Sequence, residues 1–263
     1  MNTVKIMFLN PVSTGEYDQF FADIFKENKY PNTEVHVTSL NPSIGLITNL
    51  EYRTYEAIVT ADIVKVSHQA AQEGFDAMAI GCFYDTGLYD AREISGDMVV
   101  VAPCQASVQL AMTLANNFSV VVGQRKWVHQ MQSTIHEYGY GEKLMSFRDI
   151  NMNVVEFQQD HECTRSKLID AGRKAVTEDH AECLILGCTL ETGFYKELEN
   201  ELGVPVIDPS LAVFKAAEHA ALLKQGFGWK PSRKWGSGEP PAQEIAEFGI
   251  FKKPYDFGNR IIV

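Results

Sequence analysis

The sequence GCFYDTGLY at residues 81–89 returns 106 residues later as GCTLETGFY at residues 187–195. The two segments align without a gap, and the match continues beyond them. On this offset ten positions are identical in both copies, namely Gly81, Cys82, Thr86, Gly87, Tyr89, Glu93, Val100, Pro103, Ala106 and Ala111. Chance rarely produces such a match, whereas duplication of a structural unit does. We therefore expect two similar lobes.

Each Gly-Cys pair follows a short apolar run, 77–80 in the first copy and 183–186 in the second, which is typical of a buried strand. Similar runs or alternating patterns predict strands at 4–9, 33–40, 99–102, 118–123, 152–157 and 204–207. Helices are predicted at 52–73, where Gly74 follows as a C-cap, and at 164–178. Strands that alternate with helices indicate βαβ units, so the fold class is α/β with mainly parallel sheets.

Composition excludes several classes of protein. The chain has 263 residues, of which 45% are hydrophobic and 22% charged, as in ordinary globular proteins. Its net charge of −11 makes nucleic acid an unfavourable partner. No apolar run of about 18 residues or signal-peptide pattern occurs, so we expect no membrane association and a cytoplasmic location. The five cysteines form no Cys-x-x-Cys motif, which favours free thiols and no metal site.

The repeated cysteine suggests the chemistry. Ligands of parallel α/β lobes bind at the carboxyl ends of strands, where both Gly-Cys pairs stand. Two facing lobes would place one thiol on each wall of a cleft, which we expect to hold the active site. Inversion of a carbon acid needs a base on one face and an acid on the other, and the two exchange roles when the reaction reverses. Cys82 and Cys188 are the predicted pair.

A cysteine at a strand end is more often a small buried apolar residue than a catalytic one. We assign Cys104, Cys163 and Cys183 to that structural class, and only the matched flanks single out the other two. Asp85 and Glu191, three residues after each repeated cysteine, are predicted to cap the helices that follow. After Gly226 the chain becomes rich in Gly, Pro and aromatic residues. We predict no fold for this tail but expect it to pack on its own body or on a neighbouring subunit.

These residues resemble the aspartate/glutamate/hydantoin racemase superfamily, and most of all its hydantoin racemase branch. The resemblance covers about residues 4–225 and is carried by LNPVST at 9–14, AIGCFYDTGL at 79–88, ARE at 91–93, FSVVV at 118–122, LILGC at 184–188 and GVPVID at 203–208. It implies two pseudo-symmetric Rossmann-like lobes. It also implies that the chain returns near residue 212, which gives a first lobe of 1–110 plus 212–263, tail included, and a second lobe of 111–211.

The resemblance implies racemisation by two thiols without a cofactor or metal, with Cys82 and Cys188 as the catalytic pair. It places Asn10, Phe83 and Thr189 at the substrate. Two further contacts, Ser13 and Ile44, are expected because the loops that contain them lie near the ligand in the family.

We therefore predict a cofactor-independent racemase or epimerase for a carbon acid next to a carbonyl. The substrate expected first is a 5-substituted hydantoin or a related cyclic ureide such as allantoin. The alternatives are an acyclic amino-acid racemase or a maleate isomerase-like enzyme of the same superfamily, and a non-catalytic protein that binds a small molecule. By analogy with the family we also expect a homo-oligomer.

Overall fold

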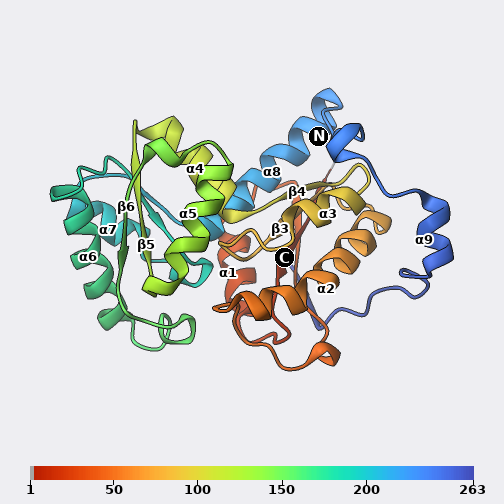
Figure 1. The fold of residues 1–263 in the computed structure, drawn as a ribbon, viewed down its shortest axis with the longest axis horizontal. Coiled ribbons are helices and arrows are strands. Elements are labelled where there is room, and N and C mark those ends of the chain that lie inside the picture. The colour runs from red at the N-terminus through yellow and green to blue at the C-terminus, as the bar shows by residue number, and fades with distance from the viewer. Residues whose placement is uncertain (1–2) are drawn as a thin grey trace. The chain divides into compact units, whose positions relative to one another are not determined.

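The computed structural model describes residues 3–263, and the chain divides into two compact units. Unit 1 takes in the described chain as far as Gly81, together with Thr86–Val101 and Phe214–Val263. Unit 2 comprises Cys82–Asp85 and Ala102–Val213. Each unit contains its own β-sheet with helices packed against it (Figure 1).

Unit 1 is built on a five-stranded sheet in the order β4-β3-β1-β2-β9. The first four strands are parallel, and β9 runs antiparallel to β2 at the edge. The bounds are β1 (Val4–Asn10), β2 (Thr33–Ser39), β3 (Ala77–Ile80), β4 (Val99–Val101) and β9 (Asn259–Ile262). The helices are α1 (Asp18–Asn28), α2 (Arg53–Gln72), α3 (Leu88–Ile94), α9 (Ala242–Phe248) and the larger part of α8 (Pro209–Phe227).

Aromatic residues fill much of the core of unit 1. The Phe25 ring lies 4.7 Å from the ring of Phe8 on β1 and 4.6 Å from that of Phe214 on α8, centroid to centroid. All three side chains are fully buried. Burial of such large apolar side chains contributes about 1.5–3 kcal/mol each. This cluster therefore holds α1 and α8 against the sheet of unit 1.

Unit 2 contains a four-stranded, fully parallel sheet in the order β6-β5-β7-β8. Its strands are β5 (Phe118–Val122), β6 (Leu144–Asp149), β7 (Leu184–Leu186) and β8 (Val206–Ile207). Its helices are α4 (Pro103–Leu114), α5 (Val128–Glu137), α6 (His161–Thr177) and α7 (Tyr195–Leu202). All residues of the central strands β5 and β7 are buried, which explains their continuous apolar sequences.

The two sheets have the same strand order once β9 is set aside, because β1 to β4 correspond in turn to β5 to β8. The helices that follow the last parallel strands begin at Pro103 and Pro209, two prolines that match in the sequence repeat. The predicted α/β fold with mainly parallel sheets and a duplicated unit is thereby confirmed.

The strand predicted at 152–157 is wrong. Asn153 and Glu156 form a capping box there, so the chain makes a short 3-10 turn at Val154–Glu156. The edge strand is β6, at Leu144–Asp149, whose residues are half-buried or exposed and show no apolar run. A strand with one solvated side has a weak apolar pattern in its sequence. The two adjacent apolar residues at 154–155 gave a stronger pattern and misled the prediction.

The tail after α8 packs on unit 1. Arg233 donates to the backbone carbonyls of Arg92 and Gly96 at the end of α3, and the Phe251 ring stacks on His68 of α2 at 4.0 Å. Other aromatic side chains of the tail are exposed, among them Trp229 and Trp235. Within residues 3–263, every helix is too short or too polar to cross a lipid bilayer.

Candidate active site

The two Gly-Cys pairs are held by the same local geometry. The N–H of Gly81 donates to the carbonyl of Leu9 on β1, and that of Gly187 donates to the carbonyl of Val121 on β5, both at 2.7 Å. A Cβ added to Gly81 would lie 2.6 Å from Cζ of Phe8, and one added to Gly187 would lie 2.7 Å from the Val121 oxygen. Only glycine fits so close to the neighbouring strand. Each cysteine is therefore placed just beyond the carboxyl end of its sheet.

The loops after the two cysteines also begin alike. The Cys82 carbonyl accepts the N–H of Asp85 at 2.9 Å, and the Cys188 carbonyl accepts that of Glu191 at 3.0 Å. Neither cysteine forms a disulfide, and both are half-buried. Contacts assign the segment Cys82–Asp85 to unit 2, the unit that also contains Cys188.

A buried carboxyl group anchors each loop through the matched threonine. Thr86 Oγ1 donates to Glu56 Oε2 of α2 at 3.0 Å, and Thr192 Oγ1 donates to Asp208 Oδ2 at 2.6 Å. Asp208 also accepts the N–H groups of Gly193 and Ser210, which ties the loop to the first turn of α8. Burial raises the pKa of Asp208, and the hydrogen bonds from Thr192 and from backbone N–H groups oppose that rise.

The prediction that Asp85 and Glu191 cap the helices directly after them is wrong, since neither α3 nor α7 has a side-chain cap. Asp85 instead caps the start of α4, where its carboxylate accepts the N–H groups of Cys104 at 2.8 Å and Gln105 at 2.9 Å. It also accepts the hydroxyl of Tyr138 at 2.7 Å. Its backbone is left-handed, with φ of 54°.

Glu191 is fully buried within the 3-10 turn Thr189–Glu191. Burial raises the pKa of its carboxyl group well above the usual 4.5, while the nearby backbone N–H groups of Gly187 and Cys188 oppose the rise. The raised pKa disfavours a negative charge on Glu191 beside Cys188. The two matched loops therefore use their acidic residues in different ways.

Asn10 and Ser13 lie at the carboxyl end of β1 and are both buried. The Asn10 amide donates through Nδ2 to Asp18 Oδ1 at 3.0 Å. A carboxylate can only accept, so this bond fixes which end of the Asn10 amide carries the oxygen. Ser13 Oγ donates to the Gly45 carbonyl and accepts the Ile47 N–H at 2.7 Å, which joins β1 to the loop at 41–47.

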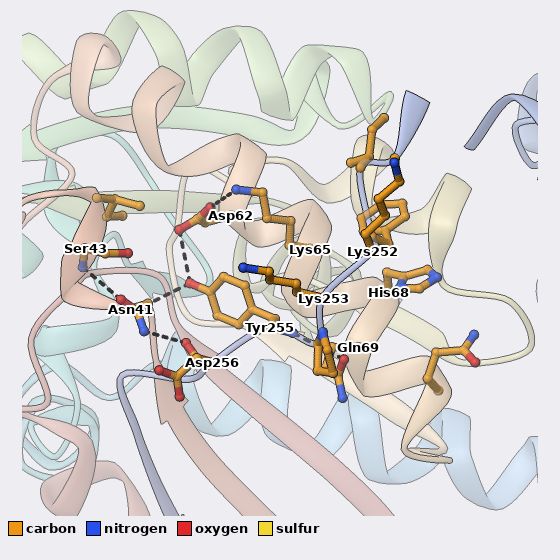
Figure 2. A pocket seen from close by; sticks show the side chains of 16 residues that line it. Asn41, Ser43, Asp62, Lys65, His68, Gln69, Lys252, Lys253, Tyr255 and Asp256 are labelled. Carbon is orange, nitrogen blue, oxygen red and sulfur yellow. Dashed lines mark hydrogen bonds and ion pairs between the residues drawn. The ribbon is translucent and has the colours of Figure 1, made fainter. Parts of the chain in front are cut away.

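The other predicted substrate residues occupy different surroundings. Phe83 and Thr189, next to the two cysteines, are buried, and the Thr189 carbonyl accepts Ser210 Oγ at 2.9 Å. Ile44 ends the short 3-10 turn Pro42–Ile44 and is half-buried. It lines a cavity of about 1000 Å³ within unit 1, between the 41–44 loop, α2 and residues 249–256 of the tail (Figure 2).

The other three cysteines differ in their burial. Cys104 and Cys183 are fully buried, and burial raises the pKa of both thiols, in the case of Cys183 to about 12. Cys163 was expected to be buried as well, but it is exposed in the first turn of α6. Among residues 3–263, no group of three or more His, Cys, Asp or Glu side chains is placed to hold a metal ion.

Sequence reasoning missed several supporting residues. Asp208 carried a usable signal, because an acidic residue directly before a proline at the first helical position is typical of a helix start. Asp18, Glu56 and Tyr138 carried none, because they reach their partners across 8 to 53 positions of the chain.

The comparisons with known proteins agree with this architecture. A family profile described as Asp/Glu/Hydantoin racemase matches residues 6–217. The hydantoin racemase of Pseudomonas sp. (strain NS671) is 33% identical over 82% of this chain and 85% of its own length. That of Paenarthrobacter aurescens is 32% identical over 84% of this chain and 92% of its own. The allantoin racemase from Klebsiella pneumoniae has a similar fold, with a TM-score of 0.81, 23% identity, and coverage of 91% of this chain and 94% of its own.

The profile spans most of the chain, and curated relatives more than 30% identical cover over four-fifths of it. The chain therefore belongs to the Asp/Glu/hydantoin racemase family and is an isomerase.

Proposed function

We propose that this protein racemises 5-substituted hydantoins or a related cyclic ureide such as allantoin, with Cys82 and Cys188 as the acid–base pair. The observation that carries the proposal is the shared construction of the two Gly-Cys ends, each with the same hydrogen bond to the neighbouring strand and a half-buried cysteine that forms no disulfide. The substrate class is supported by the relatives named as hydantoin racemases and by the fold shared with allantoin racemases.

The proposed reaction needs one thiolate and one thiol. The thiolate takes the proton from ring carbon C5, and the electron pair left behind is delocalised as an enolate onto the adjacent carbonyl oxygen. The second thiol gives its proton to the opposite face of C5 and becomes the thiolate. The reverse direction exchanges the two roles, so no net proton or electron is consumed. The titrations of the two sulfurs would be coupled.

Five residues are proposed to bind the ring: Asn10, Ser13, Ile44, Phe83 and Thr189. The Asn10 amide oxygen is the chemically defined member of this set, because its amide N–H faces Asp18. An acceptor of this kind suits a ring N–H, of which the hydantoin ring, also present in allantoin, has two. The raised pKa of the buried Glu191 carboxyl group favours the proposal further, because it disfavours an ionised carboxylate that would oppose a thiolate at Cys188.

The test uses single enantiomers of 5-isopropylhydantoin and allantoin, with aspartate, glutamate and maleate for comparison, in D₂O at neutral pH. Polarimetry follows inversion, and NMR follows deuterium uptake at the stereogenic carbon. Wild-type protein should invert both enantiomers of its substrate and incorporate deuterium. Cys82→Ser and Cys188→Ser should each abolish inversion while retaining exchange on one enantiomer only.

Cys163→Ser is the matched control, because Cys163 is exposed on α6 and has no part in the proposed chemistry. It should retain the wild-type rate. Racemisation at the full rate by both active-site serine variants would refute the two-thiol mechanism. Turnover of aspartate, glutamate or maleate alone would refute the substrate class, and binding of a hydantoin without exchange would identify a non-catalytic binding protein.

A further inference from the structure

The end of the tail lies against the part of unit 1 where Asn10 and Ser13 are found. Strand β9 pairs with β2, with Asn259 opposite Ser39, and Ser39 is itself opposite Asn10 on β1. Gly258 approaches so closely that a Cβ there would lie 2.1 Å from the Leu40 carbonyl oxygen. The family profile ends at residue 217, so this contact is made by a segment outside the matched region.

A first chain of hydrogen bonds connects the tail to Asn10. Asn259 Nδ2 donates to Asp18 Oδ2 at 3.3 Å, and the other carboxylate oxygen of Asp18 accepts Asn10 Nδ2 at 3.0 Å. Asp18 is fully buried at the start of α1, and burial raises its pKa while the bonds from Asn10 and Asn259 oppose that rise. Asn259 and Asn10 thus share one carboxyl group, and Asn259 helps hold the Asp18 side chain that orients the Asn10 amide.

A second chain connects the tail to the loop that holds Ser13. The Tyr255 hydroxyl donates to Asp62 Oδ2 on α2 at 3.1 Å and accepts the backbone N–H of Asn41 at 2.9 Å (Figure 2). Figure 2 also shows the Asn41 side chain between the tail and Ser43. Its Nδ2 donates to the Asp256 carbonyl, and its Oδ1 accepts the Ser43 N–H. The same loop continues to Gly45 and Ile47, the two partners of Ser13.

We propose that Tyr255 and Asn259 are positioning residues for substrate binding, with Asn259 acting on Asn10 through Asp18 and Tyr255 acting on Ser13 through the 41–47 loop. The inference rests on the proposed function in one respect, that Asn10 and Ser13 contact the substrate. It assigns the tail to the binding machinery, although neither residue touches the reacting carbon.

The test compares Asn259→Ala and Tyr255→Phe with two matched controls, Asn28→Ala and Tyr30→Phe, which remove the same groups from exposed positions of unit 1. Each tail variant should raise KM for the hydantoin by about fivefold to tenfold, the effect of one lost hydrogen bond, and change kcat less than about twofold. The controls should leave both constants unchanged.

A double-mutant cycle separates positioning from general stabilisation. In an Asn10→Ala background, Asn259→Ala should raise KM no further, because its effect passes through Asn10. Full additivity of the two changes in KM would overturn the inference. An unchanged KM in both single tail variants, each with normal thermal stability, would also overturn it.

Hydrogen–deuterium exchange gives a readout that does not depend on turnover. Backbone amides of residues 10–15 should exchange faster in Asn259→Ala, and those of residues 41–47 faster in Tyr255→Phe, by about threefold or more. Unchanged exchange in both would overturn the positioning role. If the wild-type protein turned over no hydantoin, the proposed function would fail while this exchange experiment still decided the role of the tail.

Discussion

Removal of the Asp85 carboxylate should be among the most damaging single changes to the loop that contains Cys82. Asp85→Ala deletes the acceptor of two N–H groups in the first turn of α4 and of the Tyr138 hydroxyl. Hydrogen bonds to a charged group contribute about 1.5–3 kcal/mol each, although their losses do not add in full. Alanine in the left-handed backbone of this position costs about 1 kcal/mol more.

Together these effects predict a loss of about 3–5 kcal/mol in the free energy of unfolding. Asp85→Asn should lose only about 1–2 kcal/mol, because asparagine tolerates the left-handed backbone and keeps one oxygen for the helix start. Tyr138→Phe should lose about 1 kcal/mol. In the Asp85→Ala background the same tyrosine change should cost almost nothing, since its acceptor is already gone.

Urea unfolding followed by tryptophan fluorescence measures these differences, with the m-value as a check that the unfolded state is unchanged. The racemisation rate of the folded variants should fall in the same order, because the Cys82 loop loses its anchor to α4. A loss below about 1 kcal/mol in Asp85→Ala, or full additivity with Tyr138→Phe, would refute this account of the loop.

Two further substitutions test the second loop. Gly187→Ala places a methyl group 2.7 Å from the Val121 carbonyl oxygen and should lower both stability, by about 2 kcal/mol, and racemisation. Gly226→Ala, where nothing lies within 4 Å, is its control in α8 and should unfold no more readily than wild type in the same urea titration. Because the pKa of Glu191 is raised in the folded protein, the free energy of unfolding of the wild type should fall as pH rises above about 4.5, by up to about 1.4 kcal/mol per pH unit. Glu191→Gln lacks this titration, so its stability relative to wild type should increase over the same range. Parallel pH–stability profiles for Glu191→Gln and wild type would show that Glu191 ionises normally in the folded protein.

Local sequence signals determined most of the architecture. The apolar runs before Gly81 and Gly187, and Gly74 after α2, predicted strand and helix ends close to those observed, because a buried parallel strand needs apolar residues on both faces and a helix end favours glycine. The repeat at residues 81–111 predicted the duplicated topology. It singled out two of the five cysteines by the same logic, and their catalytic role stays a prediction.

Only the tertiary structure decided where the polar side chains of the candidate site find their partners. Asp85 and Glu191 occupy matched positions in the repeat, yet one caps α4 and the other is buried as a raised-pKa carboxyl group. The tail carried no pattern that indicated β9 or the bonds of Asn259 and Tyr255 to residues 241 and 193 positions earlier. Strand and helix signals arise from neighbours along the chain, whereas a hydrogen bond between distant residues depends on packing that brings them together. For this reason the sequence predicted the scaffold, and the supports of the candidate site emerged only from the folded chain.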